Sequence, residues 1–383
     1  MKKTSRKMFG VILFLTGTLS AFALDIKYET PEFEGANSSI SQQTVAQFNN
    51  AVQGAFNGAL NALQDKTKGI DTKPDDFIQS WGNSAIFASH GATARGYGDY
   101  KLFSFTVGPM IGVQLPGDPL KIANELDGLT DKLNEEHDIK LGLSPQIFNA
   151  RLGINTSKFL VDKLYLGVHL GFIKLKGDDF GLDGFSYDNF SFGATANYQL
   201  IPHIKILPGI LLWRGINLGS GLIFQTTKIN YAIGLGTFEQ EFDPTISGLS
   251  NNMSLSINPN ITLDMNINTV TIPLEATTAV RLFGFLNIPI GVGVDLGFGK
   301  SYIKIGMDGK VDVTGDPNMG DYVKESKSGY VSVDAGGAMA PSFFNLKFMT
   351  GLGLNFGPVV LDIPITFYVG NGYNVGVTVG VVW

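Results

Sequence analysis

The C-terminal stretch NVGVTVGVVW, residues 374–383, decides the fold of this chain. Val375, Val377, Val379 and Val381 occupy every second position, with mostly small residues between them. Because successive side chains of a strand point to opposite faces, this segment has one continuous apolar face and one face with little side-chain volume. The same alternation with glycine recurs at 290–299 and 351–357. Such strands are typical of a barrel with lipid outside and a lumen inside.

The N-terminus has the pattern of a secretory signal peptide. Four basic residues, ending with Lys7, precede an apolar run at 8–19, and Ala21-Phe22-Ala23 provides a small-x-small cleavage site. The run is too short for the roughly 20 apolar residues of a membrane-spanning helix. We therefore expect residues 1–23 to be removed and the exported chain to begin at Leu24.

Composition excludes several classes of protein. The 383 residues include no cysteine, which excludes disulfides, thiol catalysis and cysteine-based metal sites. The formal net charge is -6 and becomes more negative once the cationic signal peptide is gone, so the basic footprint of a nucleic-acid-binding protein is missing.

Two regions are expected after the signal peptide: an N-terminal helical, plug-like segment at 24–100 and an outer-membrane barrel at 101–383. Apolar residues recur at helical spacing over 38–64, whereas 77–100 reads as irregular backbone interrupted by glycines. The helix is either a packing element under or inside the barrel or a functional gate. The plug candidates are Phe48, Val52, Phe56, Arg95 and Tyr97.

The fold class that we predict is all-β, a transmembrane antiparallel barrel of about 12 to 14 strands. Short connections such as 357–358 contrast with long polar ones such as 308–329, and residues 116–145 hold a second helical insertion with a charged side. A secreted β-sandwich also alternates, but its solvated faces carry charged residues where this chain carries glycine.

Charged residues within the strands are few, and five lie on the non-apolar phase. They either set solute selectivity in the lumen or anchor an internal plug. The four histidines lack metal-ligand spacing, and no cofactor motif is present. An outer-membrane hydrolase would need a nucleophile and a base, and no Ser–His pair suggests one, so we expect no enzyme. The lumen-lining candidates are Arg151, His169, Asp264, Asp295 and Asp362.

The final strand resembles the C-terminal assembly signal of bacterial outer-membrane proteins, whose last residue is aromatic and usually Phe. The residues that carry this resemblance are Tyr373, Val375, Val377, Val379, Val381 and Trp383. The resemblance implies an outer-membrane location, with the barrel assembly machinery and outer-membrane lipids as partners.

A narrower resemblance is to the long-chain fatty acid transporter family of outer-membrane barrels. It rests on the helical N-terminal segment, the Ala- and Gly-rich run at 91–99 and the strands that follow. The family's Asn-Pro-Ala element is missing, because Lys101 leads directly into Leu102. The resemblance implies an N-terminal plug and passive inward movement of a hydrophobic solute with lateral release. The alternative is a surface-exposed adhesin or structural barrel that acts through its loops.

Overall fold

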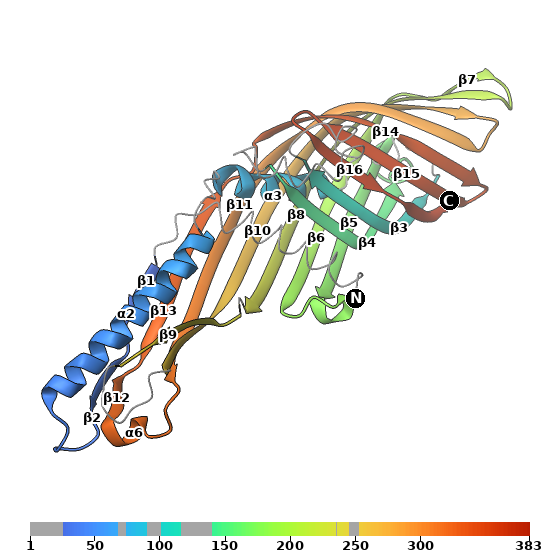
Figure 1. The fold of residues 1–383 in the computed structure, drawn as a ribbon. Helices are drawn as coiled ribbons and strands as arrows, with labels where there is room; N and C mark the ends of the chain where they lie inside the picture. Colours follow the sequence, from blue (N-terminus) through green and yellow to red (C-terminus); the bar gives the residue numbers. More distant parts are fainter. Residues whose placement is uncertain (1–25, 68–73, 90–100, 116–139, 235, 245–252) are drawn as a thin grey trace.

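The computed structural model describes residues 26–67, 74–89, 101–115, 140–234, 236–244 and 253–383 (Figure 1). None of the helices in these ranges is long and apolar enough to cross a bilayer. The helical elements are α2 (Gln42–Thr67), α3 (Pro74–Ala88), η1 (Gly177–Phe180) and α6 (Met319–Tyr322). The strands are β1 (Ile26–Glu29), β2 (Glu32–Gly35), β3 (Phe103–Gln114), β4 (Gly142–Asn155), β5 (Leu164–Lys176), β6 (Phe185–Ile201), β7 (Ile204–Leu207), β8 (Leu211–Gly234), β9 (Phe238–Phe242), β10 (Met253–Leu282), β11 (Leu286–Thr314), β12 (Val323–Lys327), β13 (Gly329–Met339), β14 (Phe344–Phe356), β15 (Val359–Tyr368), β16 (Gly372–Gly376) and β17 (Thr378–Val382).

The strands close into an antiparallel barrel, which confirms the predicted fold class. Among the described residues, ring order is β3-β4-β5-β6-β8-β10-β11, then β14 continued by β13, then β15, then β16 continued by β17, which pairs back onto β3. The C-terminal strand seals the ring, because the Trp383 backbone exchanges hydrogen bonds with Phe103 and accepts one from Leu102.

The ring has fewer strands than the 12 to 14 expected, because several predicted strands are halves of longer ones. Residues 216–228 and part of 231–241 form the single strand β8. Residues 261–267 and 279–282, where the sequence pattern indicates two strands, belong to the single strand β10, and β13 and β14 pair in sequence with the same strand, β11. A break in the apolar alternation therefore does not mark the end of a strand here.

The end of the barrel that holds the C-terminus carries an apolar belt on its outer face. On β10 and β11, the outward residues within Val270–Leu282 and Leu286–Phe298 are apolar apart from Thr278, and the inward ones are mostly polar or small. These ranges satisfy the roughly 9 to 11 residues that a tilted membrane strand needs. The C-terminal valines also face outward, with Val379 50% exposed. This belt is the surface of an outer-membrane-type barrel.

Beyond the belt, on the side away from the C-terminus, apolar and polar residues exchange faces. The inward residues become apolar and the outward ones polar, while the alternation along each strand continues unbroken. On β10 the buried residues change from Thr269 and Thr271 to Ile267, Met265 and Leu263. The exposed residues change to Asn, Asp, Ser and Thr. With 30 residues, β10 is about 100 Å long at about 3.3 Å per residue, so most of it lies beyond the belt. We call the part of the molecule beyond the belt the extension; it includes residues 253–268 of β10 and 300–314 of β11.

Helix α2 packs in the extension, at the end far from the C-terminus (Figure 1). Ser41 caps its N-terminus by accepting a hydrogen bond from the Thr44 amide at 3.1 Å. Phe48, Val52 and Phe56 are fully buried among the inward apolar residues of β10 and β11. The extension is therefore built around a hydrophobic core, and this core also includes Phe77 and Trp81 of α3.

Candidate functional site: a helix in the barrel lumen

The lumen is occupied by α3, in a stretch where the sequence predicts irregular backbone. That prediction is wrong for residues 77–88, which belong to α3. Pro74 stands at the first helical position and Asp75 and Asp76 lie in the first turn, both of which favour helix initiation. Residues 90–100 lie outside the described ranges.

Glycines of the barrel wall make room for α3. A Cβ at Gly112 would collide with the Ser84 carbonyl, and one at Gly142 would collide with the Ser80 carbonyl. Gly297 and Gly372 face the side chains of Ile86 and Phe87 in the same way. Part of the space that the glycine faces leave is therefore filled by this helix.

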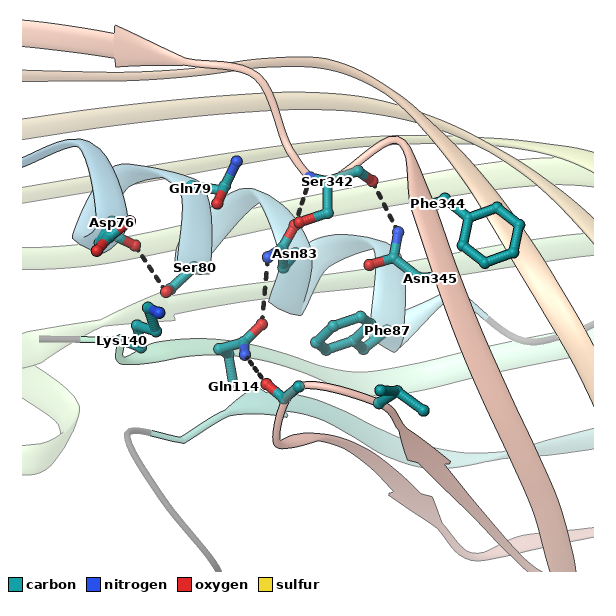
Figure 2. Close-up of a pocket in the computed structure, with 12 residues that line it drawn as sticks. Asp76, Gln79, Ser80, Asn83, Phe87, Gln114, Lys140, Ser342, Phe344 and Asn345 are labelled. Carbon is teal, nitrogen blue, oxygen red and sulfur yellow. Dashed lines mark hydrogen bonds between the residues drawn. The ribbon is translucent and has the colours of Figure 1, made fainter. Parts of the chain in front are cut away.

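Polar contacts fix the helix to three parts of the wall (Figure 2). Asn83 donates to the Gln114 side chain on β3 at 3.2 Å and accepts from the Ser342 amide at 2.7 Å. Asn374 on β16 donates to the Phe87 carbonyl at 2.6 Å. The Phe87 ring stacks on Tyr368 with ring centroids 4.1 Å apart.

A cavity of about 180 Å³ lies between α3 and the wall. Four of its lining residues carry amide side chains, and Phe87 adds an aromatic surface from the helix (Figure 2). Phe344 and Val369 also line the cavity, and both are exposed on the outer surface, at 60% and 63%. The cavity therefore extends from the lumen helix to side chains of the barrel exterior.

A buried ionic cluster lies next to Phe87. The Lys347 ammonium donates to Glu275 at 2.5 Å and to Asp295 at 2.6 Å, and the Tyr368 hydroxyl donates to Asp295 at 2.8 Å. The side chains of the ion-paired residues are at most 2% exposed. Buried charges persist only when they are paired in this way, so the cluster depends on all of its members.

On the other side of the ring, amide side chains bridge strands that are not neighbours. Gln146 on β4 donates to Gln225 on β8 at 3.0 Å, although β5 and β6 stand between these strands in the ring. Gln225 donates to Ser144 at 2.9 Å, and Asn149 donates to Gln146 at 2.6 Å. This side of the lumen is therefore packed with polar side chains.

The structure divides the lumen-lining candidates. His169 and Asp295 are buried on inward positions, and β6, β8 and β10 separate their strands in the ring. Arg151 is the cross-strand neighbour of His169, and Asp362 is inward and 7% exposed. Asp264 is exposed on the outer face of the extension, so its prediction is wrong. The inverted sidedness of β10 above the belt is the reason.

The three plug candidates that the structure describes lie outside the part of the lumen that the belt surrounds. Phe48, Val52 and Phe56 belong to the core of the extension, and α3 holds the position that we expected for the helix at 38–64. Arg95 and Tyr97 lie outside the described residues, as do residues 1–23 and most of the helical insertion predicted at 116–145.

Sequence reasoning missed Lys347, Glu275 and Tyr368. The sequence did contain a signal. Lys347 lies between Leu346 and Phe348, which are outward apolar residues of a membrane strand, so the lysine side chain must point into the lumen. A lysine at that position requires a buried carboxylate, and Glu275 and Asp295 are two of the few on inward phases.

Several solved barrels match the chain at low similarity. The translocator domain of the autotransporter NalP from Neisseria meningitidis is 8% identical, with 76% of this chain and 92% of that chain covered and a TM-score of 0.29. For the CymD monoaromatic hydrocarbon channel the identity is 8%, the coverages 78% and 98%, and the TM-score 0.23. For a Pseudomonas aeruginosa FadL homologue they are 11%, 79% and 95%, and 0.22.

No curated protein matches the chain. A family model does, and it covers the extension, the lumen helix and the whole barrel, from residue 35 to residue 383. The chain belongs to the Lsa36-like family.

Proposed function

We propose that this protein resides in the bacterial outer membrane and passes hydrophobic solutes, such as fatty acids, by passive diffusion when α3 shifts. The observation that carries the proposal is the cavity beside α3. It is lined by Phe87 of the lumen helix together with Phe344 and Val369, which also face the barrel exterior. The other residues that line the cavity are mostly polar, so a hydrophobic solute that enters beside the helix would reach the bilayer along these three apolar side chains.

The remaining lumen supports a lateral path over an axial one. The bridged amides of β4 and β8 and the Lys347 cluster occupy it, and an apolar solute gains nothing by displacing such hydrogen bonds. Arg151, His169, Asp295 and Asp362 would then act as wall or plug-anchoring residues, with any selectivity set beside α3.

The size of the cavity indicates a closed state. Ligand pockets usually measure about 300–1,000 Å³, and this one measures about 180 Å³. A long-chain solute therefore requires α3 to move, which would break its polar contacts and ring stacking and would also disturb the apolar packing of Phe77, Ile78 and Trp81.

A reversible lock on α3 tests the proposal in a chain that contains no cysteine. A Cβ at Gly82 would lie 2.5 Å from the Ser301 hydroxyl on β11, so the two positions are direct neighbours and are the pair at which we would introduce cysteines. Gly82→Cys with Ser301→Cys should abolish oleate uptake into liposomes when oxidised. Reduction should restore it.

The matched control is Gly167→Cys with Thr195→Cys, which joins β5 to β6 within the wall, where the corresponding distance is 2.7 Å. Its uptake should be the same in both redox states. Equal uptake by the locked and unlocked forms would count against movement of α3 as the gate. No uptake of fatty acid or small solute by the unmodified protein would count against transport.

The extension favours a second function, in which the barrel anchors a surface structure. Its polar outer face on β10 and β11 and the apolar packing of α2 within it exceed what a channel needs. Failure of uptake in the wild-type protein, combined with retained folding, would favour this interaction role.

A further inference from the structure

A set of hydrogen-bond donors lies on the outer face, at the border between the apolar belt and the extension. It consists of Lys228 on β8, Asn266 and Asn268 on β10, and Lys300 and Tyr302 on β11, and we call it the donor band. Asn266 pairs in register with Lys228 and Tyr302, and Asn268 pairs with Lys300. All five side chains are exposed on the outer surface.

The donor band lies at the depth of lipid headgroups. Toward the membrane, the next outward residues after Asn268 and Lys300 are Val270 and Phe298, which pair with each other and with Phe224, and on β8 Thr226 lies between Lys228 and Phe224. Two residues along a strand correspond to about 7 Å. A lipid whose chains cover these apolar residues therefore has its phosphate beside the donor band.

The charge of the band suits an anion. Neighbouring lysines are paired, Lys174 with Asp188 at 3.8 Å and Lys304 with Asp334 at 3.5 Å. Asp188 is also the register neighbour of Lys228, but the ion pairs of the described residues include none at Lys228 or Lys300. Two strand spacings and an offset of two residues along the strands separate these two lysines by about 12 Å, with the asparagine amides between them.

We propose that the donor band binds the phosphate of an anionic phospholipid in the leaflet next to the extension. Two ammonium groups offset the phosphate charge, and the asparagine amides and the Tyr302 hydroxyl supply neutral donors. Lysines with long apolar stems are suited to this depth, because the stem lies on the belt while the ammonium reaches the headgroup. The inference is independent of transport.

The test is a titration of the folded protein in neutral detergent with phosphatidylglycerol or phosphatidylcholine, with bound lipid counted by native mass spectrometry. The wild-type protein should bind phosphatidylglycerol more tightly. Lys228→Gln with Lys300→Gln should reduce that preference about 20- to 30-fold. Circular dichroism checks that the variant remains folded.

The matched control is Lys158→Gln with Lys205→Gln, which removes two exposed lysines at the opposite rim. It should keep the preference. The proposal is overturned if the wild-type protein does not distinguish the two lipids or if both double variants lose the preference equally. Displacement of the lipid by an equal concentration of inorganic phosphate would also overturn it, since the site would then recognise a free anion.

Discussion

At the scale of single residues, Lys347 is the most consequential side chain in the lumen. Its ammonium offsets two carboxylates, Glu275 and Asp295, that would otherwise be buried without a cation. Asp295 was recognisable from the sequence as an inward charge. Its partners were not, because strand order and register decide which inward residues of β10, β11 and β14 meet.

Removal of Lys347 should therefore be costly. We expect Lys347→Met to lower the free energy of unfolding by about 3–5 kcal/mol, because two carboxylates stay buried without their cation. Guanidinium unfolding in detergent, followed by tryptophan fluorescence, measures this. The control Lys304→Met removes an exposed lysine paired with Asp334 at 3.5 Å, and should cost about 1 kcal/mol or less. Similar losses in both variants would contradict the role assigned to the cluster.

At the scale of elements, the helix in the lumen is not the one that the sequence predicts. The strongly periodic helix, α2, packs in the extension, and the shorter α3 enters the lumen. Proline at the first position and the acidic first turn favour the start of α3, whereas Gly82 within the helix disfavours it. That glycine is explained by tertiary contact, because it lies against Ser301 and Pro341.

Two glycine substitutions distinguish a glycine that is needed to make space for packing from one that only makes the backbone more flexible. Gly112→Ala places a Cβ against the α3 backbone and should cost about 1–3 kcal/mol through overpacking. Gly54→Ala lies on the exposed side of α2 with no atom near its Cβ and should stabilise by about 0.5–1 kcal/mol through helix propensity. Thermal unfolding of both variants gives the two signs. Equal shifts would mean that α3 does not press on the wall at Gly112.

At the scale of the whole molecule, the connections differ between the two ends of the barrel. The end that holds Trp383 has tight turns, such as Phe283–Phe285 between β10 and β11, whereas the other end carries the extension. Outer-membrane barrels place short turns in the periplasm and longer segments outside the cell. The extension is therefore expected on the cell surface.

Cysteine labelling of intact cells tests this orientation without background, since the chain has no native cysteine. Asn260→Cys on the exposed face of the extension should react with a membrane-impermeant maleimide. Lys205→Cys, near the tight-turn end, should react only after the cells are broken. The reverse pattern would place the extension in the periplasm.

The sequence by itself determined the class of fold, because the period of two and the glycines opposite branched residues are local properties of each strand. It also determined the closing strand at 374–383 and the amphipathic helix at 38–64. The tertiary structure decided which face of a long strand meets lipid, since the alternation on β10 continues unchanged while inside and outside exchange roles near residue 269. It also decided that α3 fills the lumen beside Gly112 and Gly142, because a glycine records only that something lies close, and the contact across the barrel identifies the neighbour.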